Sequence, residues 1–348
     1  MSIFDNFFKE IGIDLGTANS LVYQKNRGLV LNEPTVAAFN NKTMEILAVG
    51  EKAKRMLGRT PEHISVVRPL VNGVISDFDM TQEFLRQLIK RLNRGNDFGG
   101  VRRAVLAVPD DLTEVERKSV EDAAMQAGCA KVHLMSSPMT VALGAGLPVD
   151  EPTASLIVDI GGGTTDIAVI SLNGTVIYKT LKIAGDKFND DIIKFFRDEF
   201  HLAVGEATAE MAKIAAGSAM PLDERLDVAV RGMDLSTGLP KEVIVKNSQI
   251  RAAISKSLRS ITEAIKEIIE STPPELVGDM LKHGIYVSGG GALLRGLDSL
   301  IEKETSVETK IIDDPLTASA RGLGLVAENM DYYKHFLANP LRPLEISL

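Results

Sequence analysis

The sequence predicts a mixed α/β protein, and two observations indicate this. Runs of β-branched residues that end at glycine-rich turns alternate with segments of helical period, which is typical of strands and helices sharing one architecture. In addition, residues 12–17 (GIDLGT) resemble residues 158–165 (VDIGGGTT) when Asp14 is placed over Asp159. This repeat favours two related halves. A chance match between two unrelated strand-turn segments is the alternative.

The composition is that of a globular protein. The chain has 348 residues, which is the length of one large or two ordinary domains. Apolar residues make up 45% and charged residues 25%, so disordered, collagen-like and coiled-coil proteins are excluded. A single cysteine, Cys129, excludes an internal disulfide and a cysteine metal cluster, and it favours a reducing, cytoplasmic compartment.

The charge and hydropathy exclude further classes. With 39 basic and 47 acidic residues the net charge is −8, so no general attraction to nucleic acid is expected. No stretch approaches 18 consecutive apolar residues, and the N-terminus lacks the pattern of a signal peptide. We therefore expect neither a membrane span nor export.

Strands and helices follow from local patterns. Strands are predicted at residues 11–14, 104–108, 156–159, 167–171 and 284–287. A helix is predicted over residues 113–127, since Thr113 and Glu116 have capping-box spacing and Gly128 follows as a C-terminal signal. Apolar residues three or four apart predict two further helices, over residues 81–93 and 248–270.

The two related segments each carry the same chemistry. Each consists of an apolar strand, an aspartate near its end, and a tight turn of glycine and threonine. Glycines let backbone N–H groups approach an anion closely, and an aspartate can hold hydrated Mg²⁺. Two such hairpins facing each other would clamp a polyphosphate. The alternative for each hairpin alone is an ordinary glycine turn with its carboxylate in water.

A third glycine cluster occupies residues 288–296 (SGGGALLRG), between a predicted strand and a helix-like stretch. This order is compatible with nucleotide binding. The cluster is neither GxxxxGK[ST] nor GxGxxG, so P-loop and Rossmann proteins are disfavoured. Serine-hydrolase, HExxH and CxxC patterns are also absent from the sequence.

Residues 13–20, 159–166 and 289–296 resemble the phosphate-1, phosphate-2 and adenosine motifs of the actin superfamily. Within it, the chain resembles the MreB family of bacterial cell-shape proteins, nearly from end to end. Further matching segments are residues 32–37, 68–75, 115–117, 221–223, 234–240 and 314–317.

The resemblance implies an actin-like fold with two ribonuclease-H-like cores, each carrying a small inserted subdomain. Subdomain IA would comprise residues 1–34, 75–146 and 320–348, and subdomain IB residues 35–74. Subdomain IIA would comprise residues 147–184 and 248–319, and subdomain IIB residues 185–247.

The resemblance also implies ATP or ADP with Mg²⁺ in a central cleft. Asp14 and Asp159 would organise the metal and its waters. The remaining nucleotide contacts would be Thr17, Ala18, Asn19, Gly162, Gly163, Thr164, Glu210, Lys213, Gly290, Gly291, Ala292 and Leu293. Ala207 stands where the family has an arginine.

One departure concerns catalysis. Members of the family have Glu-Glu-Pro where this chain has Ser136-Ser137-Pro138, and the carboxylate beside the proline positions the attacking water. Losing such a group typically lowers the rate by roughly 10²- to 10⁴-fold. The catalytic positions would then be Ser137, Thr164 and Asp159, with ATP binding retained and hydrolysis slow. Asp166 is an alternative source of the carboxylate.

The N-terminus predicts membrane contact. Five apolar residues, Ile3, Phe4, Phe7, Phe8 and Ile11, fall on one side of a helical wheel, which predicts a short amphipathic helix. Docking of this helix on the protein's own surface is the alternative. Phe98, in an expected loop, resembles the family's membrane-inserting loop.

The preferred function is an ATP-binding cytoskeletal protein that forms filaments with itself at the inner face of the cell membrane. Membrane-bound cell-shape or wall-synthesis proteins would be its further partners. Two alternatives remain: a regulatory paralogue that hydrolyses no ATP, and an actin-fold kinase or chaperone-type ATPase. A kinase would need a substrate-side aspartate, and a chaperone a substrate-binding domain; the sequence indicates neither.

Overall fold

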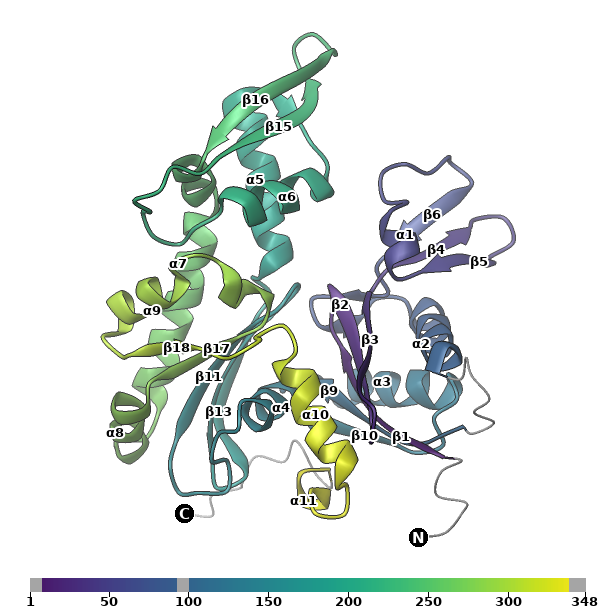
Figure 1. The fold of residues 1–348 in the computed structure, drawn as a ribbon, viewed down its shortest axis with the longest axis vertical. Coiled ribbons are helices and arrows are strands. Elements are labelled where there is room, and N and C mark those ends of the chain that lie inside the picture. The colour runs from purple at the N-terminus through teal and green to yellow at the C-terminus, as the bar shows by residue number, and fades with distance from the viewer. Residues whose placement is uncertain (1–7, 93–99, 338–348) are drawn as a thin grey trace.

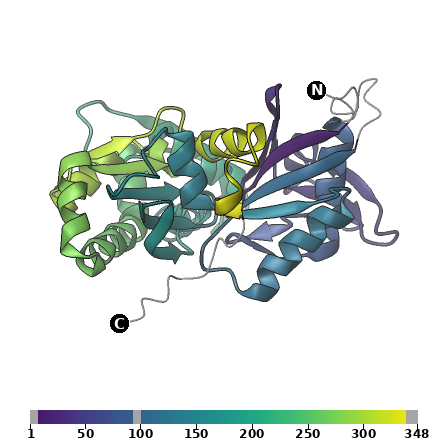
Figure 2. The same ribbon diagram turned by 90° about the horizontal axis from the view of Figure 1, so that it is seen from below.

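The computed structural model describes residues 8–92 and 100–337. Two large sheets stand side by side, and each carries a smaller β-containing unit above it, with a gap between the two upper units (Figure 1). Viewed from below, the two sheets lie on either side of helix α10 (Ala318–Glu328) (Figure 2). The predicted α/β class is confirmed.

The two large sheets have the same topology. The first sheet has the order β10-β9-β1-β2-β3, and the second has the order β13-β12-β11-β17-β18. In each sheet the three strands that come first in the sequence form an antiparallel meander. The two later strands run parallel to the first strand of that meander. The first sheet comprises β1 (Lys9–Leu15), β2 (Asn19–Gln24), β3 (Gly28–Pro34), β9 (Val101–Val108) and β10 (Val132–Ser136). The second comprises β11 (Ser155–Ile160), β12 (Thr165–Ser171), β13 (Gly174–Leu181), β17 (Ile285–Ser288) and β18 (Thr309–Ile311).

The strand register repeats the offset seen in the sequence. Asp14 pairs with Leu21 in the first sheet, and Asp159 pairs with Asp166 in the second. Adding 145 to every residue number of the five β1–β2 pairs reproduces five of the six β11–β12 pairs, all except Ser155 with Ile170. The motif repeat is therefore part of a repeated sheet, which favours related halves over a chance match.

Apolar helix faces bury both sheets. Helices α2 (Phe78–Leu92) and α3 (Glu114–Gln126) cover one face of the first sheet. Helices α4 (Ser137–Gly144) and α10 pack between the sheets. The second core contains residues from α5 (Gly185–Phe200), α6 (Glu206–Ala216), α7 (Asn247–Ser271), α8 (Pro274–His283) and α9 (Leu297–Thr305). The short helix α11 (Lys334–Leu337) follows α10 and contacts β10.

Two smaller sheets form the upper units. One has the order β5-β4-β6 and carries helix α1 (Glu51–Lys54); its strands are β4 (Ala37–Asn40), β5 (Ile46–Val49) and β6 (Ile64–Val67). The other has the order β14-β15-β16, with β14 (Leu202–Ala203), β15 (Asp227–Asp234) and β16 (Pro240–Lys246). They fall within residues 35–74 and 185–247; the subdomain boundaries themselves stay a prediction.

The local predictions have mixed outcomes. Thr113 and Glu116 form the expected capping box of α3, and α7 and α2 match the other two predicted helices to within three residues at each end. Each predicted strand is confirmed, although Gly284 lies outside β17. Within the described residues, no helix has the length and apolar content needed to cross a bilayer.

The predicted N-terminal helix is wrong at its C-terminal end. Residues 9–11 belong to strand β1, and Ile11 is fully buried in the first core. The amphipathic pattern included Ile11 because one apolar residue fits both a helical and a strand period, and pairing with β2 and β9 decides for the strand. Ile3, Phe4, Phe7 and Phe98 lie outside the described residues; Phe8 is described and is 51% exposed.

Candidate functional site

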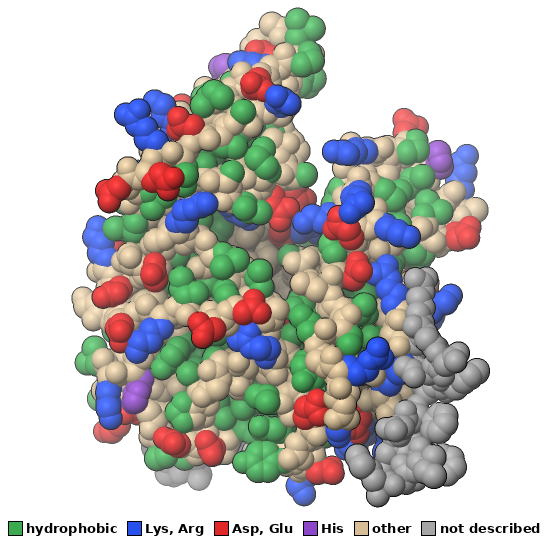
Figure 3. Space-filling view, in the orientation of Figure 1, with side chains coloured by type: hydrophobic (Ala, Val, Ile, Leu, Met, Phe, Trp, Pro, Cys, Tyr) green, Lys and Arg blue, Asp and Glu red, His purple; other side chains and the backbone are tan. Residues whose placement is uncertain are grey.

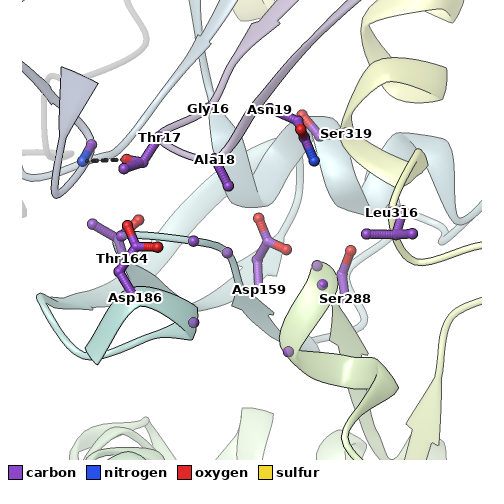
Figure 4. A pocket seen from close by; sticks show the side chains of 18 of the residues that line it. Gly16, Thr17, Ala18, Asn19, Asp159, Thr164, Asp186, Ser288, Leu316 and Ser319 are labelled. Carbon is purple, nitrogen blue, oxygen red and sulfur yellow. Dashed lines mark hydrogen bonds between the residues drawn. The ribbon is translucent and has the colours of Figure 1, made fainter. Parts of the chain in front are cut away.

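A cavity of about 580 Å³ lies where the two halves meet. Both Gly-Thr turns, the third glycine cluster and helices α5 and α6 line it. In Figure 4, Thr17 and Ala18 lie on one side of the cavity, and Thr164 and Asp159 face them from the other. The lining side chains therefore come from both related hairpins, as the sequence predicts for a clamp.

Glycine is required where the two hairpins touch. A Cβ atom on Gly162 would lie 2.6 Å from the Cβ of Ala18, and one on Gly163 would lie 2.7 Å from the Oγ1 of Thr17. Such contacts are too short for any side chain, so these positions let the two turns approach each other.

A third turn, from the Asn72-Gly73 hairpin between β7 (Leu70–Val71) and β8 (Val74–Ile75), closes this end of the cavity. Asn72 and Gly73 have φ values of 51° and 76°, as Asn-Gly hairpin turns require. The backbone N–H of Gly73 donates to the Thr17 Oγ1 over 3.0 Å. The first hairpin is thereby tied to the segment that leads to the small sheet β5-β4-β6.

The two aspartates of the repeated motif face the cavity from equivalent strands. Burial raises the pKa of Asp14 to about 6, although a hydrogen bond from Ser319 opposes the shift. Burial, with the charges of Asp166 and Asp14, raises the pKa of Asp159 to about 8. Three carboxyl groups thus share one partly enclosed space, and a cation would relieve their repulsion.

Asp166 is held by two threonines. Thr164 Oγ1 donates to Asp166 Oδ2 over 3.0 Å, and Thr180 Oγ1 donates to Asp166 Oδ1 over 2.6 Å. Burial nevertheless raises the pKa of Asp166 to about 6, so this carboxyl is mostly ionised at neutral pH. It lines the cavity beside Thr164.

Ser136 and Ser137 have different roles at the start of α4. Ser136 is the N-cap: its Oγ accepts from the N–H of Met139 over 3.5 Å, and the residue is buried. Ser137 is the first residue of the helix and lines the cavity. The structure therefore brings Ser137 together with Thr164 and Asp159, the other two predicted catalytic positions.

The third glycine cluster forms a turn and a short 3₁₀ helix, Gly290–Leu293, after strand β17. Gly289 has a φ of 79°, and a Cβ on Gly291 would lie 2.2 Å from Ile160 Cγ2, so both positions require glycine. Gly290, Gly291 and Leu293 line the cavity. The side chain of Ala292 does not: it is 1% exposed and packs into the second core.

Helix α6 contributes Glu210 and Lys213 to the same cavity. Lys213 Nζ donates to the carbonyl oxygen of Gly185 over 2.9 Å, and burial lowers the pKa of this lysine. Asn19 lines the cavity as well. All the predicted nucleotide contacts except Ala292 are thus brought to one site.

Several lining residues were not singled out from the sequence. Ser288 hydrogen-bonds Asp159 and Ser319 hydrogen-bonds Asp14, and Asp186 lies in the first turn of helix α5 at the cavity. The sequence does not indicate the role of these two serines, because the aspartates that they hydrogen-bond lie on other elements. The Asn-Gly pair at 72–73, in contrast, is a recognisable hairpin signal.

Salt bridges join the two upper units across the mouth of the cavity. Arg68 Nη1 lies 2.7 Å from Asp186 Oδ2, and Arg68 also pairs with Glu206. Lys54 of α1 lies 3.3 Å from Glu210. Figure 3 shows basic and acidic side chains meeting where the two upper units face each other. These contacts hold the cavity partly closed.

The family model described as MreB/Mbl protein matches residues 8–335. The chain belongs to the MreB/Mbl family. It is 42% identical to the cell shape-determining protein Mbl of Bacillus subtilis over 325 residues, which cover 93% of this chain and 97% of Mbl. It is 43% identical to the cell shape-determining protein MreB of Escherichia coli over 331 residues, covering 94% and 95%.

The solved structure of MreB5 of Spiroplasma citri bound to ADP matches this MreB/Mbl-family chain with a TM-score of 0.90 and 37% identity. The match covers 94% of this chain and 98% of MreB5. A second MreB5 structure, bound to AMPPNP, matches with a TM-score of 0.89. The actin-like fold predicted from the three motifs is confirmed.

The site suits a hydrated metal ion. Within residues 8–92 and 100–337, no three His, Cys, Asp or Glu side chains are grouped to bind a metal directly. Asp14 and Asp159 nevertheless carry raised pKa values that a nearby cation would reverse. The carboxylates of Asp14 and Asp159, which both line the cavity, would suit a magnesium ion through its bound waters.

Proposed function

We propose that this protein is a bacterial actin-like cytoskeletal protein that binds ATP with Mg²⁺, assembles into filaments at the inner face of the cell membrane, and governs cell shape. One observation carries the proposal: two hairpins with identical strand register face each other across a single cavity. The named relatives are cell shape-determining proteins, which supports the biological role.

For the nucleotide, the chemistry of the cavity supports the assignment. Thr17, Ala18 and Asn19 would bind phosphates from one side, and Gly162, Gly163 and Thr164 from the other. Glu210 and Lys213 would contact ribose and base, with the glycines of the third cluster beside them. MreB5, which is 37% identical, has been solved with ADP and with AMPPNP. Bound magnesium would neutralise phosphate charge.

Hydrolysis is proposed to be slow. The residue before Pro138 is Ser137, a neutral hydroxyl that can orient water but accepts a proton poorly at neutral pH. Asp166 is the neighbouring carboxylate, yet both of its oxygens already accept hydrogen bonds from threonines. The retained binding groups and the missing carboxylate together favour a long-lived ATP state.

Assembly and membrane contact are proposed from the family and from the N-terminus. Head-to-tail repetition that does not close produces fibres rather than rings. Phe8 is exposed at the start of the fold, where the apolar N-terminal segment joins strand β1. Membrane-bound cell-shape or wall-synthesis proteins are the proposed further partners.

A regulatory paralogue that binds ATP and joins the filaments of active relatives is the second candidate, and the Ser136-Ser137 pair favours it. High-speed pelleting with and without ATP, together with a phosphate-release assay, separates the candidates. Pelleting by the chain alone supports the filament proposal, whereas pelleting only in the presence of an active relative supports the paralogue. Rapid turnover without pelleting would support an actin-fold enzyme and contradict both.

The nucleotide site is tested separately by calorimetry with Mg-ATP. Asp14→Ala and Asp159→Ala should each weaken magnesium-dependent binding by at least about 1 kcal/mol, because a charged contact to metal-bound water is lost. Asp111→Ala is the control, since this exposed aspartate does not line the cavity. Unchanged affinity in both site variants would overturn the assignment.

A further inference from the structure

A second, smaller cavity of about 230 Å³ lies at the edge of the first sheet, far from the nucleotide site in the fold. The face of β9 and β10 forms one side of it, and the segment from Met330 through α11 forms the other. Its lining residues are Arg103, Lys131, His133, Met330, Asp331, Lys334 and Leu337. We call this cavity the basic groove.

The strand register explains why these cations converge. Ala104 pairs with Val132 in the parallel β9–β10 ladder, so Arg103, Lys131 and His133 project from the same sheet face. The alternating residues Ala104 and Val132 point to the other face and are buried in the first core. The basic side chains therefore lie on the face that α11 covers only in part.

The charges of the groove are not balanced within the described residues. Arg103 donates to Glu10 over 2.6 Å and lies 3.4 Å from Asp331. Lys131 and Lys334 are exposed and form no ion pair with the described residues. Burial, together with the positive charges of Lys131 and Arg103, lowers the pKa of His133, while Glu121 opposes the shift. An otherwise acidic chain thus concentrates unpaired cations at one cavity.

The groove lies near the start of strand β1, because Arg103 in its lining contacts Glu10. Strands β1, β9 and β10 are parallel, so all three begin at the same end of the sheet, with Lys9, Val101 and Val132. The exposed Phe8 immediately precedes β1 at this end. Helix α11 contacts β10 and lies at the base of the molecule in Figure 1, where the start of β1 lies to its right.

We propose that the basic groove binds the phosphate of an anionic phospholipid headgroup, with Lys131 and Lys334 as its principal contacts. Met330 and Leu337 provide an apolar wall for the glycerol portion. Residues 1–10 are nearly neutral, since Asp5 and Glu10 offset Lys9 and the α-amino group, so the terminal segment itself supplies no attraction to anionic lipid. The groove, whose Arg103 contacts Glu10 of β1, supplies that attraction. This inference rests on the proposed membrane association.

The test is flotation of the full chain with vesicles of phosphatidylcholine alone, and of phosphatidylcholine with about one-third phosphatidylglycerol. The unmodified chain should bind the anionic vesicles more tightly, and added salt should remove the difference. Lys131→Glu with Lys334→Glu should lower binding to anionic vesicles at least about tenfold and leave binding to neutral vesicles unchanged. The milder pair Lys131→Gln with Lys334→Gln should have a smaller effect of the same kind.

The matched control is Lys256→Glu with Lys303→Glu, which makes the same charge change at exposed lysines of α7 and α9. If this control loses as much binding as the groove variant, net charge explains the effect and the groove is not a site. Mg-ATP binding by each variant reports that it is folded.

Two further outcomes are decisive. Inorganic phosphate would be added at the same concentration as the phosphatidylglycerol. If it displaces the protein from the anionic vesicles, the groove is a site for soluble phosphate and the lipid assignment is overturned. Equal binding to both vesicle types, unaffected by either groove variant, would overturn the groove while leaving membrane association intact. Failure of the unmodified chain to bind any vesicle would contradict the membrane part of the proposed function as well.

Discussion

Asp159 lies directly opposite Asp166 in the antiparallel β11–β12 pair. Both side chains are partly or fully buried, and burial together with their mutual repulsion raises the pKa of Asp159 to about 8. At the equivalent position of the first sheet, Asp14 lies opposite Leu21, and its pKa is raised only to about 6. The ionised form of Asp159 therefore depends more on a neighbouring cation than that of Asp14 does.

This arrangement predicts the pH dependence of stability without nucleotide. The pKa of Asp159 rises from 3.8 to about 8 on folding, so the folded state binds more protons between these values. The free energy of unfolding should consequently fall as pH rises through this window. Asp159→Asn should flatten the curve, as measured by urea denaturation between pH 5 and 8.

Mg-ATP should also flatten the curve, because it favours the ionised carboxylate. Asp111→Asn, at an exposed position, is the control. An Asp159→Asn protein whose stability falls with pH as steeply as that of the unmodified chain would show that Asp159 is ionised throughout the window.

Arg68 is predicted to slow nucleotide release. Its partly buried guanidinium joins Asp186 and Glu206 across the cavity mouth, and ionic hydrogen bonds of this kind are worth more than exposed pairs. Arg68→Ala should speed dissociation of a fluorescent ATP analogue by about fivefold or more in stopped-flow experiments. Arg55→Ala, which removes an exposed pair with Glu51, should leave the rate unchanged. Equal release rates for Arg68→Ala and the unmodified chain would refute this role.

The N-terminal phenylalanines are predicted to anchor the protein by apolar burial. Changing Phe4, Phe7 and Phe8 together to Ser should abolish co-sedimentation with liposomes, because most of the bulky apolar surface of the segment is removed. Nucleotide binding, measured in parallel, should not change. Undiminished liposome binding by the triple variant would mean that the segment docks on the protein instead.

Because no carboxylate stands beside Pro138, adding one is predicted to raise the rate of ATP hydrolysis. Ser137→Glu should raise phosphate release at least about tenfold in single-turnover experiments at saturating ATP, equivalent to about 1.4 kcal/mol in the transition state. Ser136→Glu is the control, since residue 136 is the buried N-cap of α4 and Ser137, not Ser136, lines the cavity. Rapid hydrolysis by the unmodified chain, insensitive to either change, would mean that another group positions the water.

Much of this fold was predictable because the signals are local. The capping box of Thr113 and Glu116 specifies the start of α3 within four residues, and the apolar spacing of α7 specifies its buried face. The repeated motif of an apolar strand, an aspartate and a Gly-Thr turn predicted a pair of hairpins, because the apolar pattern of the strands and the geometry of the turn set the strand register.

What the sequence did not reveal depends on distant partners. Arg68 meets carboxylates 118 and 138 residues away, and no periodicity connects such positions. Ala292 sits within a recognised motif, yet the turn of the 3₁₀ helix directs its side chain into the core. Ile11 fits two periods at once, and only pairing with neighbouring strands assigns it to β1.

Electron microscopy of the concentrated full chain with Mg-ATP, in solution and on a lipid monolayer, tests the central claim most directly. The proposed function predicts open filaments that require ATP and that lie against the lipid, because head-to-tail contacts that do not close propagate without limit. Monomers or closed oligomers alone, both on lipid and in solution, would contradict it.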